Sequence, residues 1–483
     1  MMHESEKSDP SIVAAKPANK SEGPDAEPVE RREGAEGNTG IVIGIDGLMI
    51  VGAIARGEAR AISGIKGVIG MSRVLFSVTL VGALIGLGVS ARADVVMDWN
   101  HLAAVISEAE GMAPSEAASK WSPKEDAEEI VAVAIFQAVN TIHPLYTPAR
   151  EALAPPVGEA SGVAAVAAAG HSALVSVYPD RKAALDDDFA VMLADVPTGP
   201  ARAAGIEVGE RAAAQVIGWR TADHAPSAPP IRIAAPPGHW VPTTPNKIPA
   251  YYATAKPWLL SSPSQFRPKP PVTLVSEEWA HDYNETRSLG GRTSATRTAE
   301  WTRLATFYSQ WQQWPLVRQV AATAGRTLEQ NARLYAMVAM ATADADTAMV
   351  DGKLTYSFWR PITAIRNGDQ DGNAATERDA DWEPLLKTPM HPEYPCGHCM
   401  VISALTTVLA SEGCPPPPGG IAVMSDAMPG VVRYVESWPK LAEEVSLSRI
   451  YAGAHFRHSM EVGADLGKRV AEYELQGFLK PVH

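Results

Sequence analysis

The chain has 483 residues, with 42 lysines and arginines against 55 aspartates and glutamates, so its formal net charge is −13. Nucleic-acid-binding proteins normally carry a basic surplus, and we therefore expect no nucleic-acid partner. Hydrophobic residues make up 46% of the chain and charged residues 20%, which permits a large buried core. Three cysteines in this length exclude a disulfide-dense scaffold.

The N-terminal region differs in composition from the rest. Residues 1–40 have few large apolar side chains and many charges, and such a segment cannot offset its ordering entropy by burial. Residues 71–93 contain a short basic start, 18 uncharged residues from Val74 to Ala91, and a small-x-small cleavage site. These are the three parts of a secretory signal peptide.

We therefore predict that residues 71–93 are cleaved, which makes the protein periplasmic or secreted. Residues 1–70 are then a disordered or over-extended N-terminus, and Met71 is the true start. The alternative is an N-terminal membrane anchor, because 18 residues is close to the shortest membrane span. We expect no permanent anchor, since glycine and serine dilute the run and a cleavage site follows it.

After residue 94 the apolar residues recur mostly with helical spacing. Helices are predicted over 124–142, 158–177, 200–220, 301–311 and 334–350. Ser276, followed by two glutamates, predicts a further helix N-terminus. Thirteen prolines from Pro226 to Pro271 predict a long loop or wrap. The expected fold is all-α, a multi-helix bundle with an N-terminal helical part over 94–270, a Pro-rich wrap over 226–271 and a catalytic bundle over 271–483.

The first segment that indicates chemistry runs from Lys353 through LTYSFW to Arg360 and Pro361. Seven residues on a helix advance 700°, so Lys353 and Arg360 are expected on one helical face. Pro361 disfavours the helical conformation at Arg360 and places that arginine near a helix end. The alternative is a lysine and an arginine on a solvated face, which the adjacent aromatic residues disfavour.

Two further segments carry histidines. His391-PEY-Pro395-Cys396-Gly397-His398 leads into an apolar helix, whose free N–H groups form a ready-made anion site. Ser448-Arg449-IYAGA-His455 precedes a second apolar helix. Together the segments offer three cations, a helix N-terminus and several imidazoles. This combination suits an oxyanion, because arginine and lysine neutralise its oxygens while one histidine bonds the central atom and another acts as acid or base.

The three segments resemble the signature of vanadium-dependent haloperoxidases and of the related type 2 phosphatidic acid phosphatases. That signature reads Lys-x(6)-Arg-Pro, then Pro-Ser-Gly-His, then Ser-Arg-x(5)-His. The resemblance covers roughly residues 274–470, and it implies a helical bundle around one oxyanion site. It also implies vanadate as cofactor, with phosphate able to occupy the same site.

Carried over residue by residue, the resemblance implies that His455 is the ligand of vanadate, or the phosphorylated nucleophile of a phosphatase. It places His398 as the acid or base. The oxyanion oxygens would contact Lys353, Arg360, Cys396, Gly397 and Arg449.

The implied reaction oxidises halide with hydrogen peroxide to hypohalous acid, which then reacts with a small organic substrate. No haem or iron is needed. Bromide is favoured, since His391 is similar to the extra histidine of bromoperoxidases, although it could also be a loop histidine without a catalytic role. The alternative function is a periplasmic acid or phosphatidate phosphatase with a phosphohistidine intermediate. The sequence leaves a homodimer open, because it defines no interface.

Two positions depart from the family pattern. Cys396 replaces the serine of the second motif, and a thiol is a weak donor that can be oxidised. Ser459 stands where phosphatases carry the aspartate that orients the ligand histidine, so it is expected to orient His455 only weakly. Asp346, one seven-residue step before Lys353, is either a partner of that lysine or a surface acid.

The same cysteines and histidines also fit two other classes of site. Cys396-Gly397-His398-Cys399 spells a thioredoxin-type dithiol motif, but that chemistry expects a βαβ unit around it. A zinc site could be formed by Cys396, Cys399, His455 and His458. Cys414 is expected to be a small buried residue, too far from Cys399 to pair with it because a helix separates the two.

Overall fold

The computed structural model describes residues 94–110, 121–224, 236–243, 255–414 and 416–482. All of them belong to one compact unit, Val89–His483. The predicted signal peptide at 71–93 and the segment 1–70 lie outside the described residues. The all-α prediction is confirmed, because the described part is helical apart from one two-stranded antiparallel sheet of β1 (Ile421–Val423) and β2 (Arg433–Val435).

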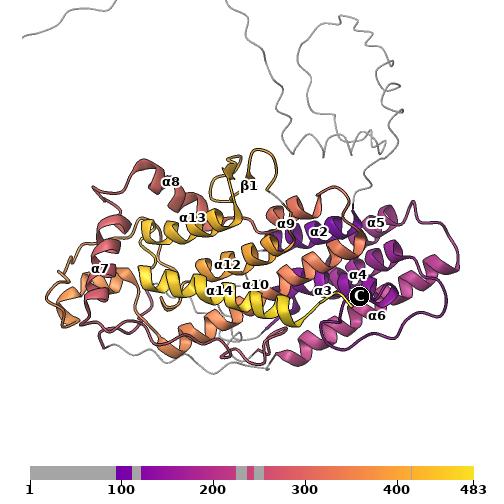
Figure 1. Cartoon of the computed structure of the whole chain (residues 1–483), viewed down its shortest axis with the longest axis horizontal. Coiled ribbons are helices and arrows are strands. Elements are labelled where there is room, and N and C mark those ends of the chain that lie inside the picture. The colour runs from indigo at the N-terminus through magenta and orange to yellow at the C-terminus, as the bar shows by residue number, and fades with distance from the viewer. Residues whose placement is uncertain (1–93, 111–120, 225–235, 244–254, 415, 483) are drawn as a thin grey trace, which may run out of the picture. The chain divides into compact units, whose positions relative to one another are not determined.

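The first helices are α2 (Val95–Glu110), α3 (Ala127–Ile142), α4 (Gly162–Val177), α5 (Lys182–Met192) and α6 (Pro200–Asp223). They pack on one another, and two of them, α2 and α3, also pack on the long helix α10 (Leu328–Tyr356) (Figure 1). The predicted helices over 124–142, 158–177 and 200–220 correspond to α3, α4 and α6. Alanine and glycine on α4 and α6 allow close contact: a Cβ on Gly209 would lie 2.3 Å from the carbonyl oxygen of Ala165.

The later helices carry the three sequence motifs. They are α7 (Glu277–Gly290), α8 (Ala299–Phe307), α9 (Trp314–Ala321), α10 (Leu328–Tyr356), α11 (Pro361–Arg366), α12 (Gly397–Ser411), α13 (Trp438–Tyr451) and α14 (Arg457–Gly477). Helices α10, α12 and α14 pack together in the middle of this part (Figure 1). Gly467 of α14 permits this approach, because a Cβ there would lie 1.9 Å from the carbonyl oxygen of Met400.

Helix ends mostly follow the capping residues. The predicted cap Ser276 is confirmed, since its side chain accepts the backbone N–H of Trp279. Thr327 and Gln330 form a capping box at the start of α10. The helix predicted over 301–311 ends earlier, at Phe307. Trp311 is extended and bridges Ser425, so the chain turns to meet the loop after β1.

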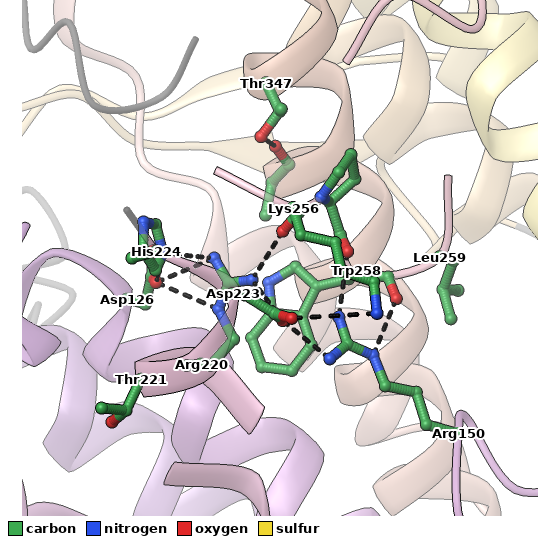
Figure 2. Close-up of polar contacts among 12 residues, drawn as sticks. Asp126, Arg150, Arg220, Thr221, Asp223, His224, Lys256, Trp258, Leu259 and Thr347 are labelled. Atoms are coloured by element: carbon green, nitrogen blue, oxygen red, sulfur yellow. Dashed lines mark hydrogen bonds and ion pairs between the residues drawn. The ribbon is translucent and has the colours of Figure 1, made fainter. Parts of the chain in front are cut away.

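The described parts of the Pro-rich segment, 236–243 and 255–271, contain no helix or strand, which confirms the predicted loop. Charged side chains bind its backbone. Arg150 donates to the carbonyls of Pro257 and Trp258, and Arg220 donates to that of Lys256 (Figure 2). Asp344 of α10 accepts the N–H groups of residues 258–260. The segment is thereby tied to three parts of the bundle.

Arg220 is itself held in a buried ion-pair cluster with Asp126, Asp223 and His224 (Figure 2). Its guanidinium lies 4.4 Å above the ring of Trp258. A buried charge is costly unless it is paired and hydrogen-bonded. The cluster therefore fixes the end of α6 against the Pro-rich segment.

No single helix in the described ranges has the length and apolar character needed to cross a membrane. Helix α4 and the following segment Pro179–Met192 meet those criteria only as a pair, bent by 120°. The predicted boundary near residue 270 stays a prediction.

Candidate active site

The three motifs lie at helix ends and converge on His455. Lys353 is in the last turn of α10, and Arg449 is in the last turn of α13. His455 lies in the loop just before α14, where its backbone N–H donates to the carbonyl of Arg449 at 3.3 Å. Arg360 Nη1 lies 3.1 Å from His455 Nε2 and Nη2 lies 2.9 Å from His391 Nδ1.

The prediction that Lys353 and Arg360 share one helical face is wrong. Helix α10 ends at Tyr356, because Ser357 takes a left-handed conformation with φ 45°. Arg360 is extended and precedes α11, as the following Pro361 requires. The two cations are brought together by a helix break instead of by helical periodicity.

Arg360 is fully buried and binds the loop before α12 as well as both histidines. Its Nε donates to the His391 carbonyl at 2.8 Å, and its Nη1 donates to the Ala454 carbonyl at 2.8 Å. Burial lowers the pKa of Arg360 to about 9, so the guanidinium keeps its charge at neutral pH. Burial also lowers the pKa of His391 and of His455 well below the ordinary value, which leaves both rings neutral.

Lys353 contacts the loop of residues 391–395. Its Nζ lies 3.0, 2.9 and 2.6 Å from the carbonyl oxygens of Pro392, Glu393 and Pro395. An ammonium group has three N–H donors, so these three carbonyls can take all of them. Burial, and then the positive charge of Arg360, lowers the pKa of Lys353 well below its ordinary value. The negative charge of Asp346 opposes this lowering of the Lys353 pKa. Burial raises the pKa of Asp346 itself to about 7.

Arg449 differs from the other two cations. Its side chain is buried, yet Nε and Nη1 have no hydrogen-bond partner among the described residues. Burial lowers its pKa to about 10, so it remains charged at neutral pH. Burying a charged group without a partner is costly. An anion that accepted these N–H groups would remove that cost.

His398, in the first turn of α12, is close to these cations. Its Nε2 lies 3.3 Å from the carbonyl oxygen of Ser309. Burial, and then the charge of Arg449, lowers the pKa of His398 to about 3. The ring is therefore neutral over the physiological range and has one nitrogen able to accept a proton.

Cys396 is the N-cap of α12, but its sulfur is joined to Cys399 in a disulfide with a Cα–Cα distance of 5.4 Å. A disulfide sulfur carries no proton. The donor predicted at Cys396 is therefore missing in this structure, and the backbone of Gly397 is what remains of the motif at the helix start. Cys414 is unpaired, as expected, but it is half-buried and not fully buried.

The other two classes of site find little support. Both cysteines of the dithiol motif are fully buried, and the motif follows a loop, with no βαβ unit in the described part of the chain. Nowhere in the described ranges do three or more His, Cys, Asp or Glu side chains form a metal site. His458 instead pairs with Glu278 at 3.2 Å.

Sequence reasoning missed Glu393. Its Oε1 lies 2.7 Å from His455 Nδ1, whereas Ser459 Oγ lies 3.5 Å from the same nitrogen. Glu393 is fully buried, and burial raises its pKa to about 7. The available signal was an acidic residue inside the HPEYP run, two residues after a candidate histidine. Nothing in the sequence indicated that this loop would reach His455, 62 residues further along.

The chain is similar to known proteins in its C-terminal bundle and in its fold. Residues 333–482 match the family described as the VCPO second helical-bundle domain, a range that contains all three motifs. A bacterial vanadium-dependent iodoperoxidase is 20% identical, with a TM-score of 0.64 over 81% of this chain and 97% of that chain. A bacterial vanadium-dependent chloroperoxidase in its holo form is 16% identical, with a TM-score of 0.57 over 76% and 94%. No curated protein matches the chain.

The chain therefore has the fold of the bacterial vanadium haloperoxidases, and its C-terminal bundle matches a family domain of that class. The resemblance expected from the three motifs is confirmed by this match and by the fold.

Proposed function

We propose that the protein is a vanadate-dependent haloperoxidase that oxidises halide with hydrogen peroxide to hypohalous acid. The observation that carries the proposal is the buried guanidinium of Arg449, whose Nε and Nη1 have no partner among the described residues, close to the neutral ring of His455. The two residues lie in a region where Arg360 is also charged. Two described carboxyls compensate only part of this charge, because burial raises the pKa of Glu393, near Arg360, and of Asp346, near Lys353, to about 7.

The residues present fit vanadate. Arg449 Nε and Nη1 are donors without partners among the described residues. His455 Nε2 presents a lone pair, which Arg360 Nη1 contacts at 3.1 Å and would give up to the central atom of the anion. Bound vanadate supplies an electrophilic centre that activates hydrogen peroxide toward halide. Around it, Arg449 and Arg360 neutralise oxygen charge, the start of α12 offers the Gly397 amide, and the neutral His398 exchanges a proton. Phosphate has the same shape and can occupy the same site.

We propose bromide as the favoured halide, with a small organic molecule as the final acceptor. His391 supports this assignment, because its ring contacts Arg360 within the site.

The test uses the purified full chain loaded with orthovanadate. With hydrogen peroxide and bromide it should brominate a phenolic dye, and parallel reactions with iodide and chloride should give the halide order. His455→Ala should lose both vanadate binding and turnover. His398→Ala should keep binding and lose turnover. Vanadate-loaded protein that oxidises none of the three halides would contradict the proposal.

A phosphatase is the second candidate, and the contact between Glu393 and His455 supports it as well. A carboxylate on Nδ1 stabilises the charge that forms on the ring when Nε2 attacks phosphorus. The vanadate-free chain would then hydrolyse p-nitrophenyl phosphate, and vanadate would inhibit it. Efficient hydrolysis without any halide oxidation would make this the function.

We also propose that the protein is exported through a signal peptide at 71–93. The Cys396–Cys399 disulfide supports this, because disulfides persist in oxidising compartments. N-terminal sequencing of the protein recovered from its native host should begin at Asp94. An N-terminus within 1–70 on the recovered protein would contradict export by this route.

A further inference from the structure

We propose that Glu393 is a positioning residue that holds His455 in a single tautomer, with its proton on Nδ1 and its lone pair on Nε2. The inference deepens the proposed function, because Nε2 is the atom that would bind vanadate or phosphorus. The tautomer itself follows from this chain's own contacts.

The first contact is on the Nδ1 side of the ring. Glu393 Oε1 lies 2.7 Å from His455 Nδ1 and also accepts the backbone N–H of Phe456 at 3.1 Å. Both side chains are excluded from solvent, with exposed fractions of 0% for Glu393 and 2% for His455. Oε1 already acts as an acceptor toward Phe456, so it can accept a second hydrogen bond from a protonated Nδ1 in either charge state of Glu393.

The second contact is on the other side and agrees with the first. His455 Nε2 lies 3.1 Å from Arg360 Nη1, and a guanidinium has donors but no acceptor. Nε2 must therefore present its lone pair. An acceptor at one ring nitrogen and a donor at the other exclude the opposite tautomer.

The loop that carries Glu393 is held at several points. Lys353 binds the carbonyls of Pro392, Glu393 and Pro395, and the backbone N–H of Glu393 donates to the Phe358 carbonyl at 2.9 Å. The hydroxyl of Tyr394 donates to the Lys269 carbonyl at 2.8 Å, which ties the loop to the Pro-rich segment. Lys353 thus contributes to the site through the loop that carries the carboxylate.

A carboxylate on the far nitrogen of a ligating histidine fixes the ring orientation and makes the ligand more basic. Removing such a partner typically lowers metal affinity by about 10- to 100-fold. Ser459, at 3.5 Å from Nδ1, is too distant to replace this contact. Glu393, in the loop before α12, therefore orients His455. The related phosphatases give this role to an aspartate at the position of Ser459.

The tautomer is measured first on the wild-type full chain without vanadate, labelled with ¹⁵N-histidine. The ¹⁵N shifts of His455, assigned with the His455→Ala variant, should show a protonated Nδ1 and an unprotonated Nε2. A protonated Nε2 would overturn the proposal. This measurement does not depend on any activity, so it tests the tautomer of His455 independently of the proposed function.

Orthovanadate is then titrated into folded Glu393→Gln, which keeps the size of the side chain and removes its charge. The dissociation constant should rise about 10- to 100-fold relative to wild type. The matched control is Glu474→Gln. Glu474 is equally buried and lies about 25 Å from the start of α14, at 1.5 Å per residue, so the vanadate affinity of this variant should not change. Unchanged affinity in Glu393→Gln, with wild type binding vanadate, would refute the positioning role.

Discussion

At the residue scale, the three cations of the motifs have different partners. Lys353 donates hydrogen bonds to loop carbonyls. Arg360 donates to carbonyls and to two imidazoles. Arg449 keeps Nε and Nη1 without partners in the described part of the chain. The motifs predicted equal roles in holding the oxyanion, whereas the contacts make Arg449 the cation most available to it.

These differences predict opposite effects on stability. Lys353→Met should lower the free energy of unfolding by several kcal/mol, because each buried carbonyl left unpaired costs about 1–3 kcal/mol. Arg449→Gln should leave stability unchanged or raise it, since it removes an unpartnered buried charge. Arg449→Gln should nevertheless weaken vanadate binding. Urea unfolding of both variants measures this, and a larger loss of stability in Arg449→Gln than in Lys353→Met would contradict the assignment.

The motif residues could be predicted because their residue types and short spacings are local properties of the sequence. Glu393 could not, because its contact with His455 depends on how Lys353 and Arg360 fold the loop between them. The thiol at Cys396 was predicted as a donor because the sequence does not reveal whether two cysteines in one helical turn are bonded.

At the element scale, the start of α12 determines how the site receives an anion. Its N-cap sulfur is bound to Cys399 and accepts that residue's own N–H at 3.3 Å. The helix N-terminus is therefore capped by a group that cannot donate to an oxyanion.

Replacing both cysteines by serine should restore a hydroxyl donor at position 396. A hydrogen bond to a charged group contributes about 1.5–3 kcal/mol, so vanadate affinity should increase roughly tenfold or more. Cys414→Ser, at the free cysteine, is the control and should leave affinity unchanged. Calorimetric titration of orthovanadate into the wild type, the double variant and Cys414→Ser measures the three affinities. Equal affinity of the double variant and the wild type would mean that the side chain at 396 points away from the anion.

Helices with strong apolar periodicity and good caps, such as α3 and α10, could be predicted from sequence. The stretch between Lys353 and Arg360 could not, since a left-handed Ser357 and the following proline override the helical spacing there. Trp311 lies outside its predicted helix for a different reason, because its backbone pairing with Ser425 replaces the helical hydrogen bonds.

At the scale of the whole molecule, α10 joins the two parts of the bundle. Its first half packs on α2 and α3, its C-terminal end carries Lys353, and Asp344 and Asp351 bind the Pro-rich segment along its length. The bundle class could be predicted from periodicity and motifs. The path of the Pro-rich segment could not, because it depends on contacts with residues from three other regions of the chain.

Buried carboxyls predict how stability depends on pH. Burial, and then the charge of Asp344, raises the pKa of Glu474 well above 4.5. A carboxyl whose pKa is raised on folding stabilises the folded state most below its unfolded pKa, and this contribution is lost as pH rises toward the folded value. Glu474→Gln should therefore raise the unfolding temperature at pH 8 much more than at pH 5.

The control for that comparison is Asp465→Asn, an exposed carboxyl on the same helix, which should change neither temperature. Thermal unfolding at the two pH values suffices. A Glu474→Gln protein that loses as much stability at pH 8 as at pH 5 would show that Glu474 is ionised in the folded state.

The central claim is that residues from three distant segments form one site that binds an oxyanion through His455. Calorimetric titration of orthovanadate into the full chain and into His455→Ala tests it most directly. One vanadate should bind per wild-type chain, and the variant should show no measurable binding. Equal binding by both proteins, or none by a folded wild-type chain, would contradict it.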